Sequence, residues 1–322
     1  MHSIFMVAGG LGLFLFGMKI MSDGLEKIAG NKIRLILKKA TSNRFFSVLI
    51  GIFFTTVVHS SSAAIIMVIS FTNAGLISLM QAIGVTLGAN VGTTISTQLI
   101  AFNIDSFTPL FIFIGSIIVL FFKNDRFKNI GYTTLGFGLL FFGITVMGMP
   151  LEEFSETLYF QEIITSLKNP FLAFCAGLIL TAIIQSSSAI MGILIAISSS
   201  GAAFPFEIAA FIILGSNIGT CLDTMLASIP ANRDAKRVAV AHFLYNIITC
   251  IFFAMLLIIF PEILLWFQNT WGNEARQIAM FHTIFNIGAL LLFIPFIGLY
   301  TNLILKMIPI KFSERKKLNL KN

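Results

Sequence analysis

The sequence predicts an all-α integral membrane protein with two inverted-topology repeats, each holding a re-entrant helical hairpin and a broken transmembrane helix. Three observations predict this fold. Of the 322 residues, 57% are hydrophobic and only 11% are charged, whereas an ordinary soluble domain has about 25% charged residues. The basic residues fall between long apolar segments, and several motifs occur twice.

The apolar segments are expected to be helices. Several uncharged stretches exceed the roughly 20 residues that a helix needs to cross about 30 Å of hydrocarbon, and none alternates like an outer-membrane strand. The first, residues 4–22, lacks the basic start and cleavage site of a signal peptide, so we expect it to remain as a membrane helix. The net charge of +7 has a topological explanation, so no nucleic-acid partner is expected.

The basic residues predict the topology. Lys and Arg gather in residues 27–44, 123–128, 233–237 and the tail from 306, and these stretches should be cytoplasmic. The other connections hold only Lys168 and Arg276 and should face outward. The chain is therefore expected in a bacterial inner (plasma) membrane as a multi-pass protein, with its N-terminus outside and its C-terminus in the cytoplasm.

Two segments fit this topology only if they contain hairpins. Residues 45–102 and 171–228 each begin and end on opposite sides of the membrane, yet each is long enough for two crossings. One crossing plus one re-entrant hairpin resolves the conflict, with the tips at the serine triplets 60–62 and 186–188. Non-helical backbone at membrane depth requires surrounding protein or a water-filled cavity, so the tips predict a polar site.

The repeat is visible in the motifs. "GIFFTTVVHSSSA" from Gly51 corresponds to "GLILTAIIQSSSA" from Gly177, and "LGANVGTT" from Leu87 corresponds to "LGSNIGTC" from Leu214. The predicted crossings place equivalent helices antiparallel, an arrangement common among secondary transporters. We expect residues 1–128 and 129–262 to be the two repeats, and 263–322 to add a transmembrane helix and a basic cytoplasmic tail. The first tip should then be reached from the cytoplasm and the second from outside.

The serine triplets predict an anion site. A lone serine in a membrane helix usually bonds to its own backbone, but a triplet duplicated in register at two predicted tips favours a ligand. The hydroxyls and free N–H groups would begin the returning half-helices, with the positive helix ends behind them. Residues 45–122 and 169–232 contain no Lys or Arg, so the anion should lack a basic partner and need co-bound cations.

The glycine-flanked motifs predict a cation site. "GANVGTT" and "GSNIGTC" should be unwound, and unwound carbonyls and side-chain oxygens suit Na⁺. Asp223 is the acid deepest in these segments and would favour a cation, although a purely structural acid remains an alternative. The predicted sodium ligands are His59, Gln185, Asn90, Thr93, Thr94, Asn217, Thr220 and Asp223.

Two further features concern side chains without predicted ligand roles. "HFLYN" at 242–246 and "HTIFN" at 282–286 place His and Asn one turn apart, and interhelical hydrogen bonds are favoured over a proton relay. The cysteines Cys175, Cys221 and Cys250 lie in apolar segments without CxxC spacing, so neither a disulfide framework nor a transition-metal site is expected.

The paired "HSSSA" and "QSSSA", each followed by its glycine motif, together with "AHFLYN", resemble the sodium/phosphate cotransporter family, which includes the animal type II carriers. The resemblance spans residues 10–295 and implies a symporter, not an enzyme, that couples Na⁺ entry to phosphate uptake by alternating access. It implies no cofactor besides Na⁺ as coupling ion. The implied phosphate site is formed by the tips, at Ser60, Ser61, Ser62, Ser186, Ser187 and Ser188, with His59 in place of the Gln expected there.

The resemblance also frames the partners and the alternatives. Phosphate, Na⁺ and the bilayer are the expected partners, and a homodimer is left open. Many bacterial relatives carry a cytoplasmic regulatory domain, which this chain is expected to lack. A carrier of another oxyanion or a carboxylate remains open, as do a passive anion channel and an intramembrane serine hydrolase. The hydrolase fits poorly, because neither copy has a G-x-S-x-G turn.

Overall fold

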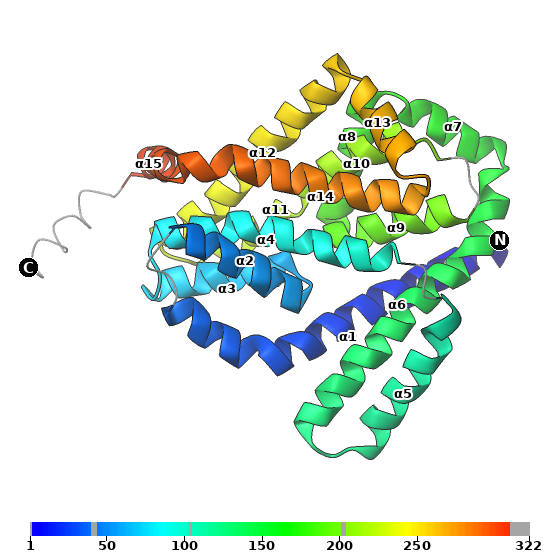
Figure 1. The fold of residues 1–322 in the computed structure, drawn as a ribbon, viewed down its shortest axis with the longest axis horizontal. Helices are drawn as coiled ribbons and strands as arrows, with labels where there is room; N and C mark the ends of the chain where they lie inside the picture. Colours follow the sequence, from blue (N-terminus) through cyan, green and yellow to red (C-terminus); the bar gives the residue numbers. More distant parts are fainter. Residues whose placement is uncertain (1, 40–43, 103–104, 201–203, 310–322) are drawn as a thin grey trace, which may run out of the picture.

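The computed structural model describes residues 2–39, 44–102, 105–200 and 204–309, and throughout these ranges the regular structure is helical, with no strand (Figure 1). The expected all-α fold is confirmed. The helices are α1 (His2–Lys39), α2 (Arg44–Val58), α3 (Ser61–Asn73), α4 (Leu79–Ile100), α5 (Thr108–Phe121), α6 (Asp125–Ser155), α7 (Leu158–Leu167), α8 (Pro170–Ile184), α9 (Ser187–Ser199), α10 (Phe206–Gly219), α11 (Cys221–Ser228), α12 (Arg233–Ile259), α13 (Glu262–Thr270), α14 (Glu274–Phe293) and α15 (Ile297–Met307), with 3₁₀ turns at Asp105–Phe107 and Ile294–Phe296.

Five helical stretches of the described chain are long and apolar enough to cross a membrane. They are Phe5–Ala29, Asp125–Gly148, Phe206–Ser228, Arg233–Ile259 and Glu274–Met307, and the pair α7 and α8, bent by 105°, makes a sixth if it counts as one span. The protein is therefore a multi-pass membrane protein. The helix α5 has only 14 residues, about 21 Å at 1.5 Å per residue, which is less than the roughly 30 Å of hydrocarbon.

The helices of the two halves correspond in length as well as in motif. The helices α2 and α8 have 15 residues each, and α3 and α9 have 13 each. The equivalent helices α1 and α6 pack together, and their glycines give the direction: Gly10 of α1 lies against Gly143 of α6, and Gly17 lies against Gly136. Because rising numbers on α1 meet falling numbers on α6, these two helices are antiparallel.

Glycines also bring each tip helix against its neighbour. A Cβ on Gly51 of α2 would clash with the carbonyl oxygen of Val85 in α4, and a Cβ on Gly177 of α8 would clash with that of Ile212 in α10. Gly88 and Gly92 of α4 lie in turn against Val48 and Ile52. Numbers rise together on α2 and α4, so these helices run parallel and the short α3 between them returns.

The glycine motifs were expected to be unwound, and this expectation is wrong for the first copy. The helix α4 continues through Gly88 and Gly92 without a break, because the glycines serve close helix packing and cost the helix no hydrogen bond. The second copy is interrupted only at Thr220, between α10 and α11, and Thr220 keeps helical angles (φ −62°, ψ −21°).

The helix α5 packs against α6 and projects with it from the rest of the molecule (Figure 1).

Replacing Gly51 with Ala should destabilise the protein, because the added methyl group would push α2 away from the α4 backbone. Overpacking of this kind costs about 1–3 kcal/mol. Thermal unfolding of the purified protein in detergent measures the effect. Gly12→Ala is the matched control, since no atom lies within 4 Å of a Cβ at Gly12. Equal melting temperatures for the two variants would contradict the close α2–α4 contact.

Candidate functional site

The two serine triplets have the same local structure. His59 and Gln185 are the non-glycine residues with positive φ in the described chain, at 55° and 59°. Each follows the last residue of a helix, α2 or α8, and reverses the chain direction. The next residue, Ser60 or Ser186, has extended backbone angles and caps the following helix, accepting a hydrogen bond from the N–H of Ala63 or Ala189 at 3.2 Å.

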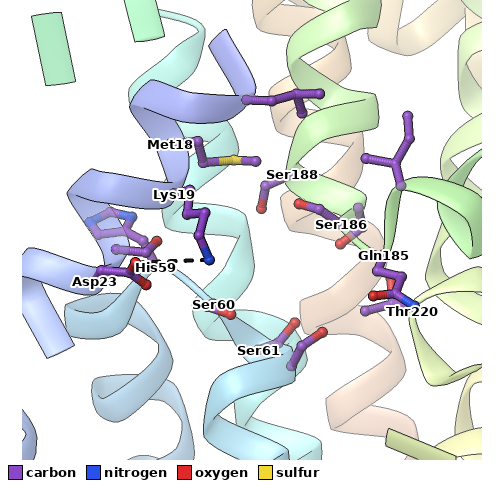
Figure 2. A pocket seen from close by; sticks show the side chains of 15 residues that line it. Met18, Lys19, Asp23, His59, Ser60, Ser61, Gln185, Ser186, Ser188 and Thr220 are labelled. Atoms are coloured by element: carbon purple, nitrogen blue, oxygen red, sulfur yellow. Dashed lines mark ion pairs between the residues drawn. The ribbon is translucent and has the colours of Figure 1, made fainter. Parts of the chain in front are cut away.

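These tips face one another across a single cavity of about 460 Å³. Figure 2 shows serines of the first tip on one side of this space and serines of the second tip on the other. Ser61, Ser187 and Ser188 are buried, whereas Gln185 is exposed to the cavity. The predicted residues on its wall are His59, Ser60, Ser61, Ser62, Gln185, Ser186, Ser187, Ser188 and Thr220. Both tips are thus open to one shared cavity in this structure, which favours access from one side at a time over the expected access from opposite sides, and labelling can decide between the two.

The cavity offers hydrogen-bond donors to an anion. The first N–H groups of an α-helix have no partner within the helix, and the α3 and α9 N-termini both begin at the cavity wall. The six serine hydroxyls of the triplets add further donors. Each helix N-terminus also carries about half a positive charge. Together these groups make a site suited to an oxyanion.

A basic residue was overlooked by the sequence analysis. The cavity wall includes Lys19 and Asp23 of α1, whose Nζ and Oδ2 atoms are 3.9 Å apart (Figure 2). The expectation that an anion at the tips has no basic partner is therefore wrong. That expectation considered charges only within the tip segments, whereas Lys19 lies on α1, 40 residues before His59. The α1 packing against α2, α6 and α9 brings it there.

The predicted sodium ligands Asn90 and Asn217 lie away from the cavity wall, in helix interfaces. The Nδ2 of Asn90 donates to Oδ1 of Asn246 in α12 at 2.9 Å, and the Nδ2 of Asn217 donates to Oδ1 of Asn286 in α14 at 3.1 Å. Asn246 and Asn286 each donate to the carbonyl oxygen of the histidine one turn earlier. The predicted interhelical hydrogen bonding of the two His-x-x-x-Asn motifs is thus confirmed.

The histidines of these motifs complete matching networks. The Nδ1 of His242 lies 3.1 Å from Oγ1 of Thr224, and the Nδ1 of His282 lies 2.9 Å from Oγ1 of Thr97. Thr97 and Thr224 are equivalent residues of the two halves. The helix α12 therefore contacts Thr224 in the same way as α14 contacts the equivalent Thr97. Both motifs are visible in the sequence, but this correspondence between their partners is not.

The remaining predicted sodium ligands either hydrogen-bond within their own helices or lie beside the tips. The hydroxyls of Thr93, Thr94 and Thr220 donate to carbonyls of their own helices. His59 Nδ1 lies 2.8 Å from the Ser96 hydroxyl. The carboxylate of Asp223 lies beside the side chain of Ser62 and so reaches the first tip from the second half.

Among the buried hydroxyls that have no hydrogen-bond partner within the described part of the chain, two are equivalent in the repeat. They belong to Thr55 and Thr181, which are both fully buried and occupy equivalent positions, one turn before His59 and Gln185. Each packs against a glycine of the other motif, Gly92 or Gly219. A buried unpaired hydroxyl is costly. In the sequence, only their place in the repeat marks these residues.

The sequence profile of the Na⁺/Pi-cotransporter family matches residues 13–149 and 154–298, which is most of the chain. The chain belongs to this family. The members of this family are transporters, so the protein is a membrane transporter and not an enzyme.

Three relatives illustrate the similarity. Uncharacterised YqeW of Bacillus subtilis is 33% identical over 92% of this chain and 96% of its own length. YjbB of Escherichia coli, whose name proposes inorganic phosphate export, is 28% identical over 92% of this chain. The chain spans only 54% of YjbB. Human sodium-dependent phosphate transport protein 2B is 27% identical over 30% of this chain and 14% of its own length. No solved structure matches the chain.

Cysteine labelling tests the shared cavity. In a Cys175→Ser background, His59→Cys and Gln185→Cys should both react with a membrane-impermeant thiol reagent from the same side of the membrane, because both positions line one cavity. The native Cys221 and Cys250 are buried. Ile190→Cys is the control and should stay unlabelled, since Ile190 is only 2% exposed. Labelling of the two tips exclusively from opposite sides would contradict the shared cavity.

Proposed function

We propose that this protein couples Na⁺ entry to inorganic phosphate uptake by alternating access. The observation that carries the proposal is the pair of serine-capped helix N-termini that face each other across one cavity. Membership of the Na⁺/Pi-cotransporter family supports the choice of phosphate over other oxyanions.

The phosphate ligands in this proposal are the hydroxyl and N–H groups of the tips. Phosphate oxygens are acceptors, and both Ser61 and Ser187 stand in the first turn of a helix, where backbone N–H groups are free. The capping hydroxyls of Ser60 and Ser186 accept from the backbone, so each still has its own hydrogen to donate. An oxyanion between the tips would thus be bound by both halves of the protein.

We propose that the tips belong to re-entrant hairpins within inverted repeats 1–128 and 129–262, followed by an additional helix and tail in 263–322. The antiparallel packing of α1 and α6 supports the inversion. The helices α2 and α3 have 15 and 13 residues, or about 22 and 20 Å at 1.5 Å per residue. Each is shorter than the roughly 30 Å of hydrocarbon. We place this protein in a bacterial plasma membrane, with the basic loops in the cytoplasm.

Sodium is proposed to bind near the ends of α2 and α8. The last carbonyl groups of a helix have no partner within it, and oxygen atoms are the ligands of hard cations. The unpartnered hydroxyls of Thr55 and Thr181 lie in these last turns. His59, Gln185 and Thr220, on the adjacent cavity wall, and Asp223, beside Ser62, remain candidate ligands. The amides of Asn90 and Asn217 are instead engaged with α12 and α14.

The geometry of the tips and the dependence of phosphate movement on Na⁺ distinguish the competing functions. A serine hydrolase needs a base beside its nucleophile, but the Nδ1 hydrogen bond of His59 goes to Ser96 of α4 and not to a tip serine, and the second tip has Gln185 in place of a histidine. A passive anion channel would move phosphate without regard to Na⁺. Phosphate export, which the name of YjbB proposes for that protein, would reverse the direction of net movement.

Uptake of radiolabelled phosphate into proteoliposomes tests the function. An inward Na⁺ gradient should drive accumulation, and an equal K⁺ gradient should not. Ser187→Ala should raise the phosphate concentration for half-maximal uptake about tenfold, because a hydrogen bond to a charged group is worth about 1.5–3 kcal/mol. Ser70→Ala is the control, since that hydroxyl is exposed and bonds to its own helix. Uptake that is equal with and without Na⁺ would overturn the proposed coupling.

Thr55→Val and Thr181→Val test the sodium sites at nearly constant volume. Each should raise the Na⁺ concentration for half-maximal uptake severalfold at saturating phosphate, because an oxygen ligand is lost. Thr72→Val is the control, since this buried hydroxyl already bonds to the carbonyl of Val68. If the two hydroxyls bind nothing, valine should instead stabilise the protein against heat and leave the Na⁺ dependence unchanged.

A further inference from the structure

One charged pair faces the cavity between the tips. Of the described residues on its wall, Lys19 and Asp23 are the charged ones. They stand one helical turn apart on α1, and Figure 2 shows the Lys19 side chain reaching from its helix towards the space between the serines. The Lys19 side chain is 73% exposed and that of Asp23 is 51% exposed, so both are free to meet a ligand in the cavity.

The electrostatics of the site leave a role for this lysine. Two helix N-termini supply about half a charge each, which falls short of a doubly charged phosphate. Lys19 adds one full positive charge on the same wall. The equivalent position on α6, 126 residues later, holds Thr145, so the second half supplies no matching cation.

The ion pair itself is weak enough to exchange partners. At 3.9 Å between Nζ and Oδ2 it is longer than a hydrogen bond, and exposed pairs of this kind contribute about 0.2–1 kcal/mol. A phosphate offers the ammonium more charge and more acceptor oxygens than one carboxylate does. Exchange of the Asp23 carboxylate for phosphate as the ionic partner of Lys19 is therefore favourable.

We propose that Lys19 is the cationic ligand of the transported oxyanion and that Asp23 holds the Lys19 ammonium while the cavity is empty. This inference rests on the proposed function and adds to it the residue that favours a multiply charged anion. Lys19 binds the phosphate together with the tip serines. Asp23 is a positioning residue that acts only through Lys19 and competes with the substrate for it.

Binding of inorganic phosphate by the full-length protein in vesicles, at saturating Na⁺, tests the proposal. Lys19→Gln should raise the half-saturating phosphate concentration about tenfold or more, as expected for loss of a charged hydrogen bond. Lys19→Arg should restore most of the affinity. Lys27→Gln is the matched control, because it removes the same charge from the same helix at an exposed position that is not on the cavity wall.

Asp23→Asn provides a change of opposite sign. It should lower the half-saturating phosphate concentration about twofold, since the exposed pair it breaks is weak. The same substitution in a Lys19→Gln background should have no effect, because Asp23 acts through Lys19. A purely structural role for the pair would instead make both single variants worse, and that result would overturn the proposal.

Two comparisons separate this inference from its alternatives. Vesicles of zwitterionic lipid and vesicles with added anionic lipid should give the same Lys19→Gln defect, whereas a defect confined to anionic lipid would assign Lys19 to a lipid headgroup. If the unsubstituted protein binds no phosphate, the proposed function itself fails. If it binds phosphate and Lys19→Gln binds equally well, the proposed function stands and the inference about Lys19 is wrong.

Discussion

Two interruptions of apolar helices, at His59–Ser60 and Gln185–Ser186, are the constraint on which the site depends. A helix break exposes backbone N–H and C=O groups, and an apolar surrounding makes each unpaired group costly. The structure meets part of this cost locally, because the positive φ of His59 and Gln185 turns the chain and the following serine caps the next helix. The residues that carry the remaining N–H groups lie on the cavity wall. The same break that costs stability therefore creates the anion site.

The glycines make this arrangement possible at close range. Each tip helix approaches its neighbour until backbone touches backbone, as Gly51 does at Val85 and Gly177 does at Ile212. In an apolar solvent such contact is a main source of helix association, because burying large apolar side chains gains little there. The asparagines of the glycine motifs then bind α12 and α14 through their amides. One short motif thus serves packing on one face and hydrogen bonding on the other.

The sequence could predict the features that short motifs carry and that occur twice in the chain. The serine triplets and the His-x-x-x-Asn motifs each lie within a few residues of sequence, and the repeat is visible because such short motifs occur twice. The role of Gly88 and Gly92 could not be read in this way, because a glycine suits either an unwound segment or a close contact, and only the neighbouring helix decides. Lys19 was missed for a related reason, since its place on the cavity wall depends on how α1 packs against three other helices.

The backbone contact between α2 and α4 has a mechanical consequence. No layer of side chains separates the helices at Gly51 and Gly88, so there are no rotamers whose rearrangement would let one helix slide along the other. The first tip must move as a rigid piece with α4, and the second with α10. The boundary of α1 with α9 is different, because there the end of the Phe14 ring meets Gly192. A contact between one side chain and a glycine can rearrange by a change of rotamer, which makes this boundary better suited to shear.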